Sequence, residues 1–232
     1  MDWLNRTRWL IGEDNIQTLK ASTVVVVGLG GVGSFTAEAI ARCGVGRMIL
    51  IDKDRVDLTN VNRQLIALRS TVGMMKAEVM KARIFDINPE AAVEAFPEAY
   101  SDETAGTFDF SGVDVIVDAI DSVDDKVALI RNCVASNIPV ISSMGAGNKM
   151  NPGAFEVSDL AKTSVCPLAR IMRKRLRDAG IEHVRVVYSK EIPVRGEGVG
   201  SIAFVPSAAG LLLASEAIRM IIDNKTKGGP DK

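Results

Sequence analysis

Glycines, carboxylates and cations lie along the first half of the chain at spacings that suit the binding of a nucleotide. The run Gly28-Leu29-Gly30-Gly31-Val32-Gly33 follows five consecutive β-branched residues and precedes a segment of helical composition at 34–43. In a strand, glycine-rich turn and helix, backbone N–H groups and the helix N-terminus surround phosphate oxygens. We therefore predict a phosphate site whose glycines are Gly28, Gly30, Gly31 and Gly33.

Two carboxylates follow the second apolar run. Residues 48–51 are apolar and lead into Asp52, nineteen residues beyond Gly33, and Asp54 comes two positions later. A carboxylate at about this distance from a glycine fingerprint binds the ribose of a nucleotide. The pattern predicts an adenine nucleotide, with Asp52 at its ribose, but does not distinguish ATP from a dinucleotide.

The polar run 59–64 contains Asn60, Asn62, Arg63 and Gln64. It is too short and too rich in asparagine for a helix, and it is expected just outside the carboxyl ends of the strands. Ligands of open α/β sheets bind at that edge. Taken alone, this run would be better explained as an ordinary surface turn with an arginine at the surface.

Lys76 occupies an unusual position for a lysine. In a helix over 75–87 it shares one face with Met80, Ile84 and Ile87. A cation in a first helical turn also opposes the helix dipole. A bound anion resolves both conflicts, whereas the alternative is that the side chain extends to solvent. We expect an anion.

Asp121 completes a set of residues for ATP. It follows a predicted strand at 113–118 and emerges at the same sheet edge as Gly28 and Asp52, while Ser122 serves as the cap of the next helix. A carboxylate that faces a polyphosphate predicts Mg²⁺. A nicotinamide-dependent oxidoreductase has no need of Arg63, Lys76 or Asp121, so the full set favours ATP.

The elements that position these residues alternate between strand and helix. Strands are predicted at 24–27, 48–51, 92–96, 113–118 and 139–143, which indicates an α/β fold with a Rossmann-like, doubly wound, mainly parallel sheet. A less regular C-terminal third adds strands at 154–157 and 184–188 and helices at 167–178 and 206–222. A further helical segment at 6–19 precedes the first strand. We expect one domain over 1–232, with a nucleotide-binding part at 22–145, a substrate and dimer part at 146–224 and a disordered tail at 225–232.

Composition restricts the class of protein, its cofactors and its cellular location. The net charge of −1 argues against a nonspecific coat for nucleic acid, and three scattered cysteines exclude a disulfide framework and a four-cysteine zinc site. The N-terminus lacks the apolar core of a secretory signal, so a cytoplasmic location is expected. The apolar stretch 202–222 contains Pro206, Glu216 and Arg219, which favours a buried or interface helix over a membrane span.

The order and spacing of these motifs from about Arg8 to Asp121 resemble the adenylation domain of the ubiquitin-activating-enzyme-like superfamily, which includes the ThiF, MoeB and HesA group. The resemblance implies that Asn60, Arg63 and Lys76 contact phosphates and that Asp121 holds Mg²⁺. It implies that Arg8 reaches the ATP of the partner in a homodimer. The nucleotide-binding set that it implies is Gly28, Gly30, Gly31, Gly33, Asp52, Asp54, Asn60, Arg63, Gln64, Lys76 and Asp121, with Arg8, Arg63, Lys76 and Asp121 serving catalysis.

Later motifs resemble one branch of that superfamily. DAIDSVDDK at 118–126 and the runs at 142–147, 157–163 and 167–169 are similar to the tRNA threonylcarbamoyladenosine dehydratases. The resemblance implies ATP-dependent adenylation of the threonyl carboxylate of a modified adenosine in tRNA, followed by ring closure. The basic cluster at 170–177 would then contact tRNA phosphates, although a merely solvated helix face explains it as well.

Three other functions compete. An activator of a ubiquitin-like sulfur-carrier protein, with a carrier or cysteine-desulfurase acceptor as partner, is disfavoured because the chain has no CxxC motif, which also argues against structural zinc. A nicotinamide-dependent oxidoreductase and a module that only binds nucleotide leave parts of the ATP set unexplained. A carboxylate nucleophile is ionised near neutral pH, so His183 is expected to be structural. Cys166, before a predicted helix start, is either a reactive thiol or a simple helix cap.

Overall fold

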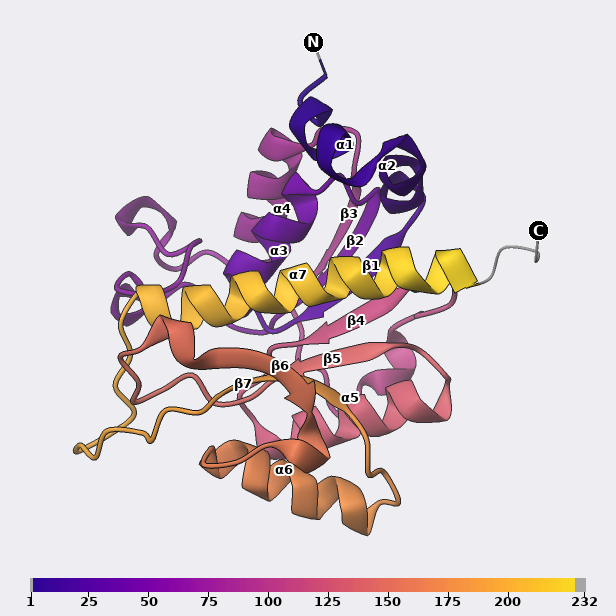
Figure 1. Cartoon of the computed structure of the whole chain (residues 1–232). Helices are drawn as coiled ribbons and strands as arrows, with labels where there is room; N and C mark the ends of the chain where they lie inside the picture. The colour runs from indigo at the N-terminus through magenta and orange to yellow at the C-terminus, as the bar shows by residue number, and fades with distance from the viewer. Residues whose placement is uncertain (1, 228–232) are drawn as a thin grey trace.

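The computed structural model describes residues 2–227, which form a seven-stranded sheet flanked by helices (Figure 1). The strand order is β3-β2-β1-β4-β5-β7-β6, and all neighbours are parallel except β6 and β7. The strands are β1 (Thr23–Val27), β2 (Arg47–Ile51), β3 (Ala92–Phe96), β4 (Val115–Asp118), β5 (Val140–Ser143), β6 (Phe155–Asp159) and β7 (Arg185–Ser189). The helices are α1 (Asn5–Ile11), α2 (Glu13–Lys20), α3 (Gly33–Arg42), α4 (Lys76–Ile87), α5 (Val123–Ala135), α6 (Pro167–Asp178) and α7 (Phe204–Lys227).

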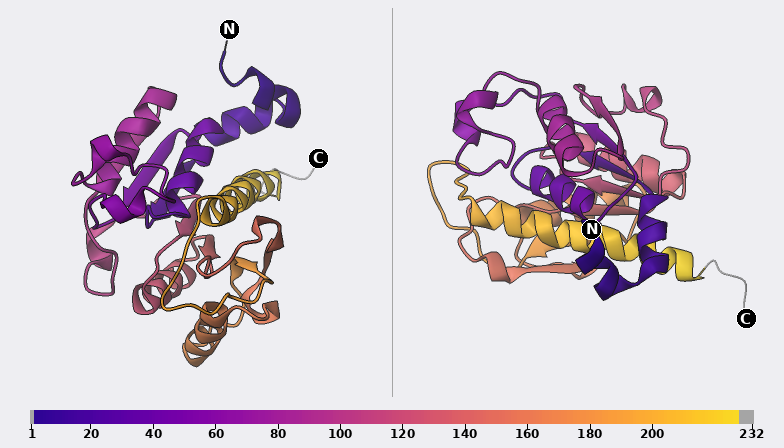
Figure 2. Two further views of the ribbon diagram at one scale, coloured as in Figure 1. Left: turned by 90° about the vertical axis from the view of Figure 1, so that its left-hand side faces the viewer. Right: turned by 90° about the horizontal axis from the view of Figure 1, so that it is seen from above.

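Both faces of the sheet are covered, which explains the unbroken apolar sequence of β1. Val24 and Val26 belong to the core beneath α3, α4 and α7, while Val25 and Val27 belong to the core beneath α5. Successive side chains of a strand point to opposite faces, so a strand between two helical layers has no polar face. In Figure 1 the long helix α7 runs across one face of the sheet, and Figure 2 shows it from two further sides.

The topology places the site. β1 lies between β2 and β4, so the chain leaves β1 toward one side of the sheet and later returns to the other. Ligands of open α/β sheets bind outside the carboxyl ends of the strands at such a switch point. The register brings the ends of the three strands level, because Val27 pairs with Ile51 on one side and with Asp118 on the other.

Three predictions about the elements need correction. The segment 6–19 is not one helix, because Gly12, at φ +83°, separates α1 from α2. The polar run 59–64, by contrast, is confirmed as turn structure: it begins at the end of a 3-10 turn (Leu58–Asn60) and continues as turn residues. The last helix extends beyond 206–222 at both ends, so residues 225–227 are helical and not a disordered tail. The rest of that predicted tail, 228–232, lies outside the described residues.

The helix α7 would be long and apolar enough to cross a membrane if length and composition alone decided the matter. Half of its apolar stretch is buried inside the protein, however. Its residues Ala209, Leu213 and Ala217 belong to the main core together with β1 and α3. Packing of this kind is that of a core helix.

Candidate functional site

A cavity of about 550 Å³ opens at the carboxyl ends of β1, β2 and β4. Its walls bring together almost the whole set of residues that the sequence predicts for ATP. The members that line it are Gly28, Gly30, Gly31, Asp52, Asp54, Asn60, Arg63, Gln64, Lys76 and Asp121. Gly33 lies just behind this wall, at the start of α3, and Arg8 is elsewhere.

The glycines of the loop serve two different purposes. Gly28 has φ +88°, and a Cβ there would lie 2.6 Å from the carbonyl oxygen of Ala119; a Cβ on Gly33 would lie 1.8 Å from the carbonyl oxygen of Gly28. These two positions therefore need glycine for the backbone itself. Around Gly30 the nearest atom to such a Cβ is the Gln64 Nε2, at 3.8 Å, so this glycine leaves open space toward the cavity.

The N-terminus of α3 follows directly after the loop, and no side chain of the described residues caps it. The first N–H groups of a helix have no partner within the helix and carry the positive end of its dipole. Together with the open space around Gly30, this arrangement fits phosphate oxygens.

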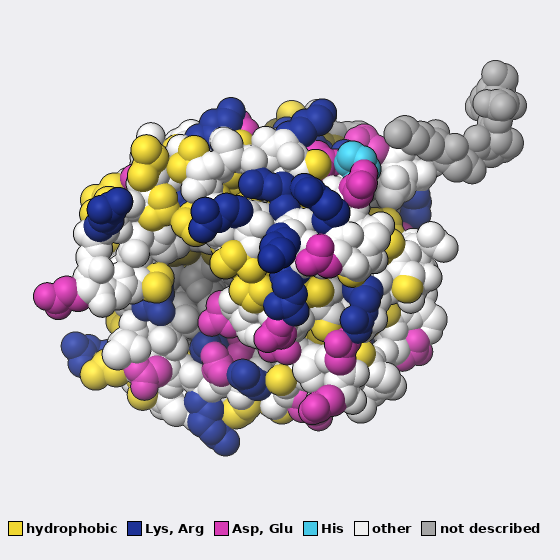
Figure 3. Space-filling model, turned by 90° about the horizontal axis from the view of Figure 1, so that it is seen from below, with side chains coloured by type: hydrophobic (Ala, Val, Ile, Leu, Met, Phe, Trp, Pro, Cys, Tyr) yellow, Lys and Arg dark blue, Asp and Glu magenta, His cyan; other side chains and the backbone are white. Residues whose placement is uncertain are grey.

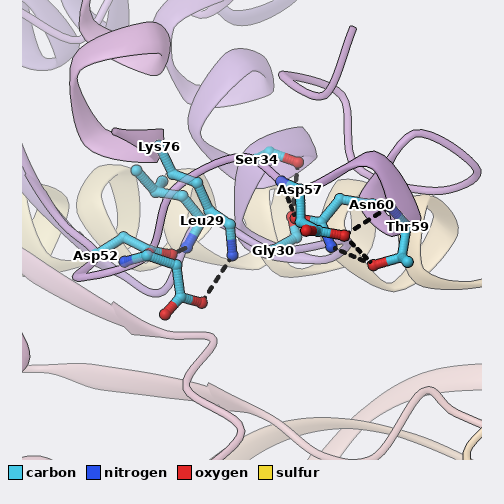
Figure 4. A network of polar contacts seen from close by, with 9 residues as sticks. Leu29, Gly30, Ser34, Asp52, Asp57, Thr59, Asn60 and Lys76 are labelled. Atoms are coloured by element: carbon cyan, nitrogen blue, oxygen red, sulfur yellow. Dashed lines mark hydrogen bonds and ion pairs between the residues drawn. The ribbon is translucent and has the colours of Figure 1, made fainter. Parts of the chain in front are cut away.

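Asp52 and Lys76 occupy the wall beside the loop (Figure 4). The Asp52 carboxylate accepts hydrogen bonds from the N–H of Leu29 at 2.6 Å and from that of Asp54 at 2.8 Å. Burial raises the pKa of Asp52, and the charge of Lys76 and the two N–H donors oppose this rise. Lys76 is only 5% exposed, and its Nζ lies 2.8 Å from Asp54 Oδ2. Lys76 thus points into the cavity and does not extend to solvent.

Asn60, Arg63 and Gln64 form the opposite part of the wall. Asn60 Oδ1 accepts from the N–H of Asp57, which closes the 3-10 turn and fixes the start of the run (Figure 4). Arg63 donates from Nη1 to the Thr59 carbonyl and to Asn62 Oδ1, both at 2.9 Å. The buried Oε1 of Gln64 has no hydrogen-bond partner in the part of the chain that the structure describes. An unsatisfied buried oxygen is uncommon, and here it leaves an acceptor for a ligand.

Asp121 lies at the mouth of the cavity, three residues beyond the end of β4. Ser122 Oγ accepts from the N–H of Asp125 at 3.5 Å, which confirms Ser122 as the cap of α5. Within residues 2–227, Asp121 has no hydrogen-bond or ion-pair partner. Its carboxylate is therefore available to a cation.

The donor set also fits a divalent cation that accompanies a polyphosphate. Five carboxylates and only three cations line the cavity, so the wall alone does not neutralise the charge of ATP. The described part of the chain contains no group of three or more Asp, Glu, His or Cys placed to hold a metal. Mg²⁺ characteristically takes one or two carboxylates and completes its shell with phosphate oxygens and water.

Two of the singled-out residues lie away from the cavity. Arg8 forms ion pairs with Asp2 and Glu13 on the N-terminal segment and does not reach the pocket of its own chain. His183 is exposed and lies 3.0 Å from Asp159 Oδ2. Neither position gives contact with a nucleotide in the same protomer.

The cysteines show no exposed thiol at the site. Cys166 is 2% exposed and occupies the cap position of α6 without a side-chain capping bond. Burial raises the pKa of the Cys133 thiol to about 12 and also raises that of Cys43. Thiols with raised pKa values remain protonated and unreactive at neutral pH.

Sequence reasoning missed part of the wall. Glu98, Ala99 and Tyr100 line the cavity because they follow β3 at the same sheet edge, as Asp52 follows β2. Their place directly after a predicted strand could have identified them from the sequence. A second omission is Lys126, which is completely buried next to Asp118. Its signal was a lysine on an apolar helix face, the same signal that identified Lys76.

Comparison with known proteins gives a consistent result over nearly the whole chain. The sequence model of the ThiF family matches residues 4–230. The tRNA threonylcarbamoyladenosine dehydratase of Bacillus subtilis is 46% identical over 250 residues, which cover 98% of each chain. The crystal structure of Escherichia coli tRNA N6-threonylcarbamoyladenosine dehydratase in complex with ATP has a TM-score of 0.93 and 38% identity, covering 97% of this chain and 96% of that one. The same enzyme in complex with AMP has a TM-score of 0.92 and 39% identity, covering 96% and 94%.

Proposed function

The chain belongs to the ThiF family, and we propose that it is a tRNA threonylcarbamoyladenosine dehydratase that uses ATP to cyclise its substrate. The observation that carries this function is the likeness to the dehydratase of Bacillus subtilis over nearly the full length of both chains. Complexes of the Escherichia coli enzyme with ATP and AMP support the nucleotide. The cavity at the switch point supports it independently, since its walls hold the predicted ATP residues.

The reaction would proceed in two steps within this cavity. A carboxylate oxygen of the threonyl group attacks the α-phosphorus of ATP, the bond to the bridging oxygen breaks, and pyrophosphate leaves. A nucleophile within the same modified nucleoside then attacks the activated carbonyl carbon. AMP departs with one of the original carboxylate oxygens, and the nucleophile loses its proton to solvent, so the product lacks one water.

We assign the residues of the cavity to this chemistry as follows. The glycine loop and the N-terminus of α3 bind phosphate oxygens, and Asp52 accepts hydrogen bonds from the ribose hydroxyls. Asn60 and Arg63 bind phosphate oxygens, and Lys76 contacts the outer phosphates. The two cations reduce the repulsion between two anions that must approach each other. Asp121 would hold Mg²⁺, which would further neutralise the phosphates. The nucleophile is already ionised, so alignment and charge neutralisation provide the catalysis.

We propose that tRNA lies along the exposed face of α6. Arg170, Lys174 and Arg177 recur at helical spacing and are exposed, and their side chains have no ion-pair or hydrogen-bond partner among the described residues. By contrast, Arg173 donates to Thr163 and Arg175 pairs with Asp124 at 2.7 Å. Figure 3 shows Lys and Arg side chains gathered on this side of the molecule, next to a hollow. Leu168 of the same helix lines the ATP cavity, so RNA on α6 would lie close to the nucleotide.

We further propose a homodimer in which Arg8 reaches the ATP of the partner. We place the interface at the N-terminal segment and α7, where large apolar side chains are exposed: Trp9 at 80%, Leu10 at 85% and Leu211 of α7 at 54%. Sedimentation at micromolar concentration should give a dimer, and a monomer would contradict the proposal. Mixing an Arg8→Ala chain with an Asp121→Ala chain should restore part of the activity if Arg8 acts across the dimer, whereas verified heterodimers without recovery would exclude the crossing.

The remaining assignments follow from the proposed activity. We treat 1–232 as one adenylation domain, with a nucleotide-binding part at 22–145 and a substrate and dimer part at 146–224. A cytoplasmic location fits an enzyme that acts on tRNA with ATP. The competing proposal is that the chain acts on a sulfur-carrier or cysteine-desulfurase partner protein and not on tRNA.

The substrate whose carboxylate is adenylated can be identified by ATP–pyrophosphate exchange in three parallel reactions. One contains tRNA that carries threonylcarbamoyladenosine, one contains a ubiquitin-like sulfur-carrier protein, and one contains neither. Exchange that requires the modified tRNA, together with formation of the cyclic nucleoside, is the expected result. Exchange that depends on the carrier protein and leaves the tRNA unchanged would replace this function with carrier activation.

A further inference from the structure

A buried ion pair lies directly beneath the ATP cavity. The side chains of Lys126 and Asp118 are both 0% exposed, and Lys126 Nζ lies 2.8 Å from Asp118 Oδ2. The same Nζ lies 3.3 Å from Ser142 Oγ and 3.0 Å from the carbonyl oxygen of Ser143. Lys126 therefore has three acceptors for its three N–H groups.

The acceptors belong to the two strands that end at this part of the cavity. Asp118 is the last residue of β4, and Ser142 and Ser143 are the last two residues of β5. Asp118 also accepts from Ser142 Oγ at 2.6 Å and, through Oδ1, from the N–H of Ile120 at 3.1 Å. A single ammonium group thus joins the ends of two neighbouring strands and the first turns of α5.

Both strand ends continue into segments that line the cavity. Residues 119–122 follow β4 and include Asp121, while residues 143–147 form the wall after β5. The carboxylate of Asp118 is bonded to the first segment through Ile120, and Lys126 is bonded to the second through Ser143. The ion pair therefore links these two walls, in addition to the backbone pairing of β4 with β5.

Stability alone gives a weak reason for this arrangement. Removing two charges from water costs several kcal/mol per ion, and well-packed apolar residues often replace a buried pair without loss of stability. A cation near the start of α5 also opposes the helix dipole. Fixing the position of the segments attached to the pair is a function that apolar side chains would not provide.

We propose that Lys126 is a positioning residue of the adenylation site, which fixes the segment carrying Asp121 against the segment 143–147. The proposal rests on the proposed function for the reaction that benefits. Through Asp118, Lys126 sets the backbone at Ile120, and through Ser143 it sets the opposite wall. The carboxylate of Asp121 then faces the phosphates without rearrangement when ATP binds. Lys126 acts through its neighbours and does not itself touch ATP.

The test compares Lys126→Met, which keeps the length and removes the charge, with Lys126→Arg and with a matched control. The control is Glu216→Gln, which disrupts the 2.6 Å pair between Arg185 and the largely buried Glu216 on α7, outside the cavity. For each variant we would measure the melting temperature, ATP affinity with and without Mg²⁺, kcat, and amide hydrogen exchange at Ile120 and Met144.

Lys126→Met should lower kcat about tenfold or more, because small displacements of reacting groups are costly. It should weaken the effect of Mg²⁺ on ATP affinity and speed exchange at Ile120 and Met144 while the rest of the sheet stays protected. Lys126→Arg should recover part of kcat. Glu216→Gln should lose stability with kcat and local exchange unchanged.

A folded Lys126→Met variant with normal kcat and normal exchange at both amides would overturn the proposal. The proposal would also be overturned if Glu216→Gln lowered kcat as much as Lys126→Met does, because kcat would then follow stability and not the position of the cavity walls. If Lys126→Met does not fold, Ser142→Ala removes two bonds of the network, those of Ser142 Oγ with Lys126 and Asp118, and unchanged exchange at Ile120 would then overturn the proposal. ATP affinity and exchange do not require tRNA turnover, so failure of the dehydratase function would be recognised separately.

Discussion

The ATP cavity and the exposed face of α6 hold their cations in opposite ways. In the wall of the cavity, Lys76 is buried and paired with Asp54, and Arg63 is bonded to Thr59 and Asn62. On the side of α6, the exposed Arg170, Lys174 and Arg177 have no partner among the described residues. The first arrangement suits one small anion in a fixed place, whereas the second suits a long polyanion.

Solvation explains the difference. A buried ammonium without a partner is costly, so a site for a small ligand holds its cations with local acceptors until the ligand arrives. An exposed cation is already solvated and can exchange its counterions for RNA phosphates. We therefore expect substitutions in the cavity to cause large losses of ATP affinity that are nearly insensitive to salt. Substitutions on α6 should cause a smaller loss of tRNA affinity for each residue, and that loss should depend on salt.

The largest effect is expected in the glycine loop. Gly33→Ala places a Cβ 1.8 Å from the Gly28 carbonyl oxygen, so the loop must move and ATP binding should be lost, with a lower melting temperature. Gly30→Ala is the matched control, because its Cβ meets only Gln64 Nε2 at 3.8 Å and the fold should persist. Thermal unfolding and ATP titration would distinguish them. Equal stability and ATP affinity in Gly33→Ala and the native protein would contradict the role of this loop.

Lys76→Ala should lower ATP binding or turnover at least about tenfold, since a charged contact contributes about 1.5–3 kcal/mol. Affinity for tRNA should stay the same, and the loss should persist as salt rises. Steady-state kinetics at two ionic strengths would measure it. Tight NAD binding that Lys76→Ala leaves unaffected would show that the cavity serves a different nucleotide.

Charge reversal at Arg170, Lys174 and Arg177 should weaken tRNA binding by roughly tenfold at moderate salt and reduce the salt slope by about one for each lost phosphate contact. Arg173 is left intact, because its bond to Thr163 supports the local fold. Reversal of the exposed Lys20, Lys81 and Lys225 changes the net charge equally and is the control. If both triple variants bind tRNA alike in filter-binding assays, α6 is only a solvated face.

The smallest effect concerns pH. Because burial raises the pKa of Asp52 above the ordinary value of about 3.9, its carboxylate protonates early on acidification and ATP affinity should fall severalfold while the protein is folded. The sign for stability is opposite: the folded chain binds this proton more readily than the unfolded chain, so Asp52 itself adds stability as pH falls through that window. Asp52→Asn should remove this step from the pH profile of ATP affinity. An identical profile in the variant would assign the step to another group.

Much of the ATP side could be predicted from the sequence because its signals are local. Five β-branched residues before Gly28 indicate a buried strand, and parallel strands bring Asp52 and Asp121 to one edge whatever the rest of the chain does. Lys76 was recognisable because a lysine on an apolar face conflicts with its surroundings. In each case neighbouring residues contain the necessary information.

The remaining features depend on contacts between distant segments. The burial of Lys126 depends on Ser143, which α5 meets only in the folded sheet. Two arginines of α6, Arg173 and Arg175, are held by contacts with Thr163 and Asp124, which lie outside α6 and could not be paired with them from the sequence. The division of 6–19 at Gly12 needed a positive φ that the sequence alone did not require. Arg8 was placed by resemblance, and in a single protomer it pairs with its own neighbours.

The central claim, that the carboxylate of the tRNA substrate is activated at the α-phosphorus, can be tested by following the carboxylate oxygens. Threonylcarbamoyladenosine in tRNA would be prepared with isotopically heavy oxygen in its carboxylate and incubated with ATP, Mg²⁺ and the protein. Mass spectrometry should find one heavy oxygen in AMP for each cyclic nucleoside formed. Heavy oxygen in inorganic phosphate with release of ADP, or AMP that contains none, would contradict adenylation of the carboxylate.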